Sequence, residues 1–111
     1  MRLTFLDPGR LTARLDLEAE AATPDGQGGA VVAWSHVASL WGLVEPVSAR
    51  PHEEAGATAA TITHRVTMRM RGDVARGMRL VHRGRALAIR AVHDPDARGA
   101  YLVCLCEEDG R

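Results

Sequence analysis

Several features that would place a protein in a familiar class are missing from this sequence. Its 111 residues include only two cysteines, Cys104 and Cys106. They stand two apart in an apolar segment, where an extended backbone holds their side chains parallel and keeps them from bonding. Because no disulfide framework is available, we expect the chain to work in a reducing compartment and to gain stability from partner subunits.

An excess of charge is also missing. The 14 basic and 14 acidic residues balance to a formal charge of zero, and the two signs are intermixed along the chain. A protein whose main task is to grip phosphate backbones needs a concentrated positive field, so this balance argues against that class. Lysine is absent, and arginine suits planar pairing with carboxylates across subunit contacts. No apolar run reaches the length of a membrane span and no signal-peptide pattern opens the chain, so we expect neither membrane contact nor export.

Patterns for catalysis and metal binding are missing as well. The five histidines form no pair at the spacing of metal ligands: His36, His52, His64, His82 and His93. Two cysteines would supply only half of a structural zinc site. No Gly-x-Ser-x-Gly elbow occurs, no cysteine has a histidine near it in the sequence, and the glycines at 26, 28 and 29 are too few for a dinucleotide fingerprint. We therefore expect no enzyme activity, no metal and no cofactor.

What the chain does have is an unbroken alternation over residues 61–71. The apolar side of this segment contains Ile62, His64, Val66, Met68 and Met70. The polar side contains Thr61, Thr63, Arg65, Thr67, Arg69 and Arg71. A period of two predicts a β-strand with one buried face, because successive side chains on a strand point to opposite sides.

Further strands are predicted on either side of this one. They cover about residues 11–20, 31–47, 78–82, 86–92 and 100–106. Turn signals separate them, among them the glycine-rich loop 23–29 and a tight turn at Arg83-Gly84. The segment 48–60 fits no strand, which predicts a long loop or a short helical insertion. We expect one domain over residues 1–111, of the all-β class, built as a small antiparallel barrel or sandwich of about six strands.

The predicted core consists of apolar residues from four of these strands. It contains Val37, Leu40, Trp41, Leu43, Ile62, Val66, Met68, Leu87, Ile89, Val103 and Leu105. Segments 37–44 and 101–106 are apolar on both faces, which is more apolar surface than one small barrel can cover. We therefore expect part of it to lie between subunits, at Trp41, Leu102 and Cys104.

The arginine row Arg65, Arg69 and Arg71 leaves three interpretations open. It could be a solvated face, it could form ion pairs across strands or subunits, or it could line a surface that faces DNA. An acidic row on the first strand, Asp16, Glu18 and Glu20, has the opposite sign. We favour subunit contact over DNA contact and include the three arginines in the expected interface.

Several segments, in their order and spacing, resemble the phage head–tail joining family, also called head-closure or stopper proteins. They are Gly9-Arg-Leu with Arg14-Leu-Asp-Leu, Asp25-Gly-x-Gly-Gly29 with Trp34, Val37-Ala-Ser-Leu-Trp-Gly-x-Val-Glu-Pro46, Thr63-His-Arg-Val-Thr-Met-Arg69, Met78-Arg-Leu with Arg83-Gly-Arg85, and Asp94-Pro-Asp96 with Arg98-Gly-x-Tyr-Leu102. The resemblance covers most of the chain.

The resemblance implies a small β-barrel that assembles into a ring, expected to be a hexamer, at the head–tail connector of a phage or a gene transfer agent. The ring would close the DNA exit channel and offer a docking platform to the tail. Its partners would be a portal or adaptor ring on the head side, a tail terminator on the tail side, and double-stranded DNA in the channel. Assembly would take place in the bacterial cytoplasm, before the ring becomes part of the particle.

From its composition alone, the segment 48–60 could equally be an exposed surface loop without a partner or a channel gate, and the resemblance favours the gate. Its gating residues would be Arg50, Pro51, His52, Glu53, Glu54, Ala55 and Gly56. Small side chains would let such segments pack closely at the ring axis, and the two glutamates would repel DNA phosphates. Two alternatives stay open: an adaptor ring that contacts the portal directly, and a nucleic-acid-binding β-barrel that uses the arginine row.

Overall fold

The computed structural model describes residues 7–54, 57–95 and 97–108, and for 48–54 and 57–60 it describes the backbone only. The first described element is a short 3-10 helix, η1 (Pro8–Arg10), capped by the Asp7 side chain. The strands are β1 (Ala13–Pro24), β2 (Ala30–Glu54), β3 (Ala57–Arg69), β4 (Arg79–His82), β5 (Arg85–His93) and β6 (Tyr101–Glu108). No helix in the described part of the chain is long and apolar enough to cross a membrane.

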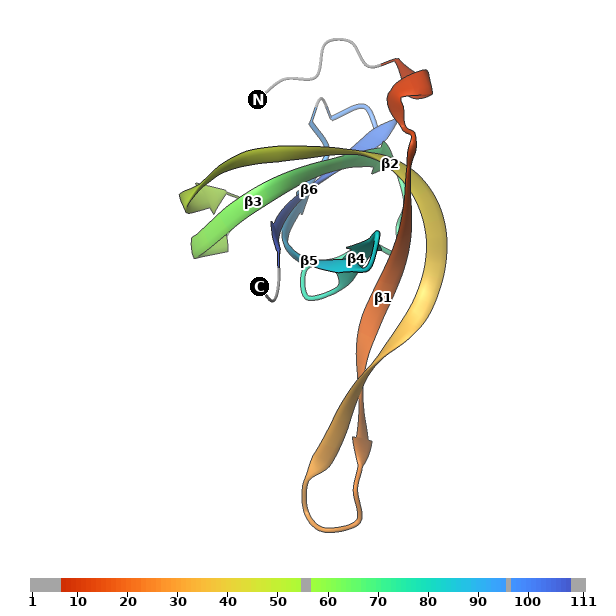
Figure 1. Cartoon of the computed structure of the whole chain (residues 1–111), viewed down its shortest axis with the longest axis vertical. Helices are drawn as coiled ribbons and strands as arrows, with labels where there is room; N and C mark the ends of the chain where they lie inside the picture. Colours follow the sequence, from red (N-terminus) through yellow and green to blue (C-terminus); the bar gives the residue numbers. More distant parts are fainter. Residues whose placement is uncertain (1–6, 55–56, 96, 109–111) are drawn as a thin grey trace.

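The six strands form one antiparallel sheet that closes on itself (Figure 1). Their order around the barrel is β1-β2-β3-β6-β5-β4, and β1 meets β4 over Asp16–Glu18 and Arg79–Val81 to complete the closure. The predicted all-β barrel is therefore confirmed. Closure leaves each strand hydrogen-bonded on both sides where it belongs to the barrel wall, which removes the exposed edges of an open sheet.

Turn residues explain two of the connections. Arg83 and Gly84 both have positive φ, 54° and 79°, as a two-residue type I′ hairpin between β4 and β5 requires. In the loop between β1 and β2, an Asp25 side-chain oxygen accepts hydrogen bonds from the backbone of Gln27 and Gly29, at 2.8 and 3.1 Å. Both turns were expected from their glycines.

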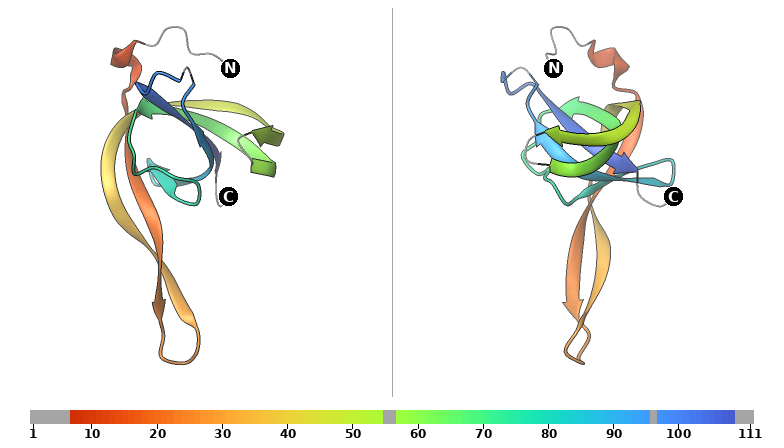
Figure 2. Two further views of the ribbon diagram at one scale, coloured as in Figure 1. Left: turned by 180° about the vertical axis from the view of Figure 1, so that it is seen from behind. Right: turned by 90° about the vertical axis from the view of Figure 1, so that its left-hand side faces the viewer.

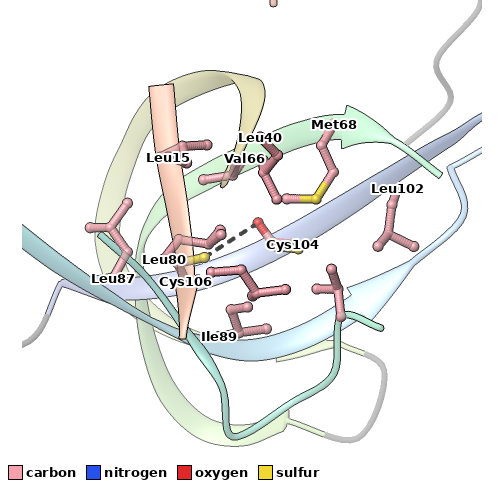
Figure 3. Close-up of a cluster of buried hydrophobic side chains, with 12 residues drawn as sticks. Leu15, Leu40, Val66, Met68, Leu80, Leu87, Ile89, Leu102, Cys104 and Cys106 are labelled. Atoms are coloured by element: carbon pink, nitrogen blue, oxygen red, sulfur yellow. Dashed lines mark hydrogen bonds between the residues drawn. The ribbon is translucent and has the colours of Figure 1, made fainter. Parts of the chain in front are cut away.

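The barrel interior is filled by one apolar cluster (Figure 3). Its buried members are Leu15, Leu17, Leu40, Val66, Met68, Val74, Leu80, Leu87, Ile89, Leu102, Cys104 and Cys106. Gly42 allows this packing, since a Cβ there would lie 2.8 Å from the Leu15 side chain and 3.1 Å from the Thr67 carbonyl oxygen. The alternation predicted for β3 is confirmed in part, because Val66 and Met68 are almost fully buried. Thr67, on the predicted polar side, is however only 3% exposed, and Met70, on the predicted apolar side, is 38% exposed.

A second, smaller apolar cluster consists of Ile62, Ala91, Val103 and Leu105, with Val47 packed against it. Alternate residues of β6 therefore belong to the two clusters, and this strand is covered on both faces by its own chain. A register shift between Pro46 and Arg50 lies beside Val47. Such irregularities increase the local twist of a strand pair.

The core prediction was wrong at three positions on β2. Leu43 is only partly buried and belongs to neither apolar cluster. Val37 and Trp41 are 40% and 54% exposed, whereas Leu40 between them is buried. Only one face of β2 meets the interior, and a segment that is apolar on both faces does not reveal which face that is. The prediction also left out Leu15, Leu17 and Leu80, which are fully buried.

Two hairpins extend away from the barrel. The β1–β2 hairpin runs on past the barrel wall, pairing from Glu18 with His36 to Pro24 with Ala30, and its tip is the far end of a molecule that measures 52 × 29 × 25 Å (Figures 1 and 2). We call residues 19–35 the arm. The β2–β3 hairpin leaves the barrel in another direction (Figure 1).

The segment 48–60 was expected to be a loop, and this expectation was wrong for most of it. β2 continues to Glu54 and β3 begins at Ala57, with Arg50 opposite Ile62 and His52 opposite Ala60. Alanine and proline are poor strand residues, but pairing with a neighbouring strand outweighs such weak preferences. Ala55 and Gly56 lie outside the described residues.

Candidate assembly surfaces

The arginine row is partly neutralised by ion pairs within the chain. Arg65 on β3 lies 3.7 Å from Glu45, its neighbour across the strand pair. Arg71 donates two hydrogen bonds to Asp73, of 3.0 and 2.9 Å, and this contact lowers the pKa of the Asp73 carboxyl. Arg69 is exposed and makes no ion pair within residues 7–54, 57–95 and 97–108.

The acidic row of β1 also has partners of its own. Glu18 accepts a 2.7 Å hydrogen bond from Arg79 on β4, and Asp16 accepts one of 2.7 Å from Ser39 on β2. Among the described residues the two rows therefore do not pair with each other. Arg65, Glu18 and Asp16 have partners on neighbouring strands, whereas Arg71 pairs with Asp73 just beyond the end of β3. Of the three interpretations of the arginine row, cross-strand pairing within the chain accounts for Arg65.

Trp41 lines a groove beside η1. The groove has a volume of about 390 Å³ and is lined by apolar side chains, among them Leu11, Trp41 and Met70, with Arg69 and Arg71 alongside. Trp41 is 54% and Met70 38% exposed. This groove places the expected interface residues Trp41, Arg69 and Arg71 together on one surface.

Leu102 and Cys104 do not belong to that surface. They are 6% and 0% exposed inside the barrel, so the expectation that they meet a neighbouring subunit was wrong (Figure 3). The apolar residues on the other face of β6 are covered by the second cluster, which leaves no excess apolar surface on this strand. Burial raises the pKa of the Cys104 thiol to about 12 and also raises that of Cys106, so both sulfurs stay protonated at neutral pH.

The described residues contain no cluster of three or more His, Cys, Asp or Glu that could hold a metal ion. His64 lies within hydrogen-bonding distance of the neighbouring Thr63 hydroxyl, 2.9 Å from it. The pKa of His82 is lowered, mainly by burial and then by Arg83. His64 and His82 are therefore strand residues whose surroundings are a neighbouring hydroxyl and partial burial.

The arm is a feature that sequence reasoning missed. Both of its strands and the intervening loop were expected, but not their extension beyond the barrel. Its residues 19–35 include no basic residue and only Glu20 and Asp25 as acidic residues, and Val31 and Val32 near the tip are 58% and 53% exposed. The long uncharged run between Asp25 and His36 was the signal that could have drawn attention to it.

The arm is fastened at its base. Trp34 packs against Arg79, whose guanidinium carbon lies 4.3 Å from the ring centroid, and Arg79 holds Glu18. Beyond this contact β1 pairs with β2 alone. An isolated two-stranded ribbon is marginally stable in water, so the contact at its base contributes to holding the arm in place.

Comparison with known proteins gives the same picture of the chain. A family model described as phage head completion protein matches residues 6–109. A chain in the virion of a native gene transfer agent particle is 26% identical, with a TM-score of 0.65, and the match covers 89% of this chain and 96% of that one. A protein of Shigella flexneri 2a with a solution structure is 31% identical, with a TM-score of 0.73, over 96% of this chain and 99% of that one.

No curated protein matches this chain. The family model, however, spans almost its whole length, and the two solved structures are similar in both sequence and fold. The resemblance noted in the sequence is thereby confirmed. The chain belongs to the phage head completion protein family and is a structural component of the head–tail region of a phage or phage-like particle.

Proposed function

We propose that this chain forms a homo-oligomeric ring at the head–tail connector, which closes the DNA exit channel and receives the tail. The observation that carries the proposal is the family match over residues 6–109, together with the similar chain in a gene transfer agent virion. The ring would lie between a portal or adaptor ring and a tail terminator. The subunit count, expected to be six, rests on the family resemblance.

The β2–β3 hairpin is the proposed gate. Its distal part comprises 50–54 of β2 and 57–62 of β3, paired from Arg50 with Ile62 outwards. A hairpin is better suited than an unstructured loop to reach a ring axis, because its backbone hydrogen bonds fix its direction. Glu53 and Glu54 would then stand near the DNA path and repel its phosphates.

The two alternatives differ in what supports them. A nucleic-acid-binding barrel would need the arginine row as a positive surface, yet Arg65 and Arg71 are engaged by Glu45 and Asp73. An adaptor ring that contacts the portal would use the same fold. The position of the chain in the connector decides between adaptor and stopper.

The test is complementation of particles assembled without this chain. We expect such heads to fill with DNA but to lose it and remain without tails, and purified chain added to freshly filled heads should restore tailed particles. Electron microscopy of the restored particles would place the ring. Normal tail attachment without the chain would contradict the proposal. A ring seated directly on the portal would assign the adaptor role instead.

A further inference from the structure

The arm exposes two unprotected strand edges. Beyond Glu18, β1 and β2 pair only with each other, so the outer edges of 19–24 and 30–35 have backbone groups with no neighbouring strand. Soluble proteins usually guard such edges with charged residues, and 30–35 contains none. Two exposed valines at positions 31 and 32 add apolar surface near the tip. This combination indicates a surface that is covered in the assembled state.

The groove beside η1 is complementary to the arm. It is lined by Leu11, Trp41 and Met70, and its charged side chains, Arg69 and Arg71, are both basic. Because Arg71 is already paired with Asp73, Arg69 is the basic side chain of the groove that can meet an acidic residue of the arm. The charged residues of the arm, Glu20 and Asp25, are both acidic. The volume of the groove, about 390 Å³, falls within the range of roughly 300–1,000 Å³ that is usual for binding pockets and is enough for a few side chains.

The two surfaces cannot meet within one molecule. The tip of the arm is at one end of the long axis, and η1, which borders the groove, is at the other (Figures 1 and 2). We propose that the arm of one subunit docks into the groove of a neighbouring copy, with Val31 or Val32 against Trp41 and Met70. This contact deepens the proposed ring and rests on it.

Such a contact is heterologous, because one copy contributes the arm and the next contributes the groove. Repetition of a heterologous contact gives a closed ring or an open filament, according to whether the rotation closes. A single arm in a groove of this size buries little surface compared with a stable interface of about 1,600 Å². The free chain should therefore associate weakly and form the ring on a platform supplied by the particle.

Disulfide trapping between two single variants tests the contact. Val32→Cys is placed on one chain and Met70→Cys on a second chain with a size tag, and the two are mixed under mild oxidation. Both positions are exposed, and the native Cys104 and Cys106 are buried with raised pKa values, so they stay unreactive. We expect a mixed covalent dimer. The control pairs V32C with Arg85→Cys, a position outside the groove that is more accessible than Met70, with a side chain 65% exposed.

The expected yield of the V32C–M70C dimer is several-fold above that of the control pair. Adding Val31→Asp to the arm chain should reduce it to the control level without loss of folding, since Val31 is exposed. Equal yields in both pairs would overturn the proposal. In the complementation assay, chains with V31D and Val32→Asp should fail to restore tails. Full restoration by them would refute the arm contact and leave the head–tail function standing, whereas failure of the unaltered chain would refute the function itself.

Discussion

The two projecting hairpins share β2 but differ in what holds them. The β2–β3 hairpin is fastened by Ile62, which packs with Val103 and Leu105 of β6 in the second cluster. The arm has no such cluster, and its tip residues Val31 and Val32 remain exposed. We infer that packing within the chain fixes the position of the β2–β3 hairpin, whereas the arm is fixed by contact with a neighbouring subunit. Strand β2 thus contributes to a hairpin held in place by its own chain at one end and to a hairpin that docks on a neighbour at the other.

The largest difference between the hairpins should appear in stability. Ile62→Ala removes a side chain that is 3% exposed, and truncation of buried isoleucine costs about 2–5 kcal/mol of unfolding free energy. Val32→Ala removes a side chain that is 53% exposed, and the expected change is within about 0.5 kcal/mol. Urea unfolding of both variants measures the two values. Similar losses would contradict the comparison.

A smaller effect is expected at the base of the arm. Trp34→Ala removes the contact with Arg79 at 4.3 Å, and cation–π pairs contribute about 0.5–2 kcal/mol according to their solvation. Trp41→Ala is the matched control, since Arg14 lies farther from its ring, at 5.4 Å, and the ring is 54% exposed. We expect Trp34→Ala to lower the unfolding free energy more than Trp41→Ala. Hydrogen exchange should also quicken in 19–24 and 30–35 in the first variant alone.

The smallest effect concerns pH. The pKa of His82 is lowered from its ordinary value of 6.5, chiefly by burial, so the unfolded chain binds this proton more readily than the folded one. Its contribution to stability is therefore complete above about pH 6.5 and is lost as the pH falls through the lowered value. The difference in unfolding free energy between the unaltered chain and His82→Gln should narrow below pH 6.5. A difference that does not change between pH 7.5 and pH 5 would contradict this.

How far the sequence predicted the fold depends on the local pattern. The Arg83–Gly84 turn has one physical meaning and was interpreted correctly. The alternation around Val66 located the buried Val66 and Met68, but it did not reveal that Thr67 between them is buried as well. Where a strand is apolar on both faces, its sequence does not show which face points into the barrel. For this reason Trp41 was placed in the core and Leu102 on the surface. The register shifts of β2 near Pro46 and His52 depend on its neighbour β3. No local signal in 48–60 could reveal that pairing.

The candidate surfaces were predicted in part for the same reason. Arg69 and Arg71 were selected as part of one arginine row and Trp41 was selected separately, and only the closed barrel brings them to one groove beside η1. The arm was divided in the sequence into two strands and a loop. Its projection follows from β4, which is short and pairs with β1 only as far as Glu18. How far one strand extends beyond its neighbour depends on how the strands pair in the folded barrel, so it cannot be predicted from the strand's own sequence.

The most direct test of the different roles of the hairpins is DNA retention in complemented particles. Residues 52–60 are replaced by Asn-Gly, which closes the hairpin with a two-residue turn at the Pro51–Thr61 pair and leaves the barrel intact. The account predicts that this chain enters the connector, whereas the particles lose their packaged DNA before tails attach. The V31D/V32D chain should instead be missing from the connector. Particles that contain the shortened hairpin and retain their DNA as fully as the unaltered ones would contradict the account.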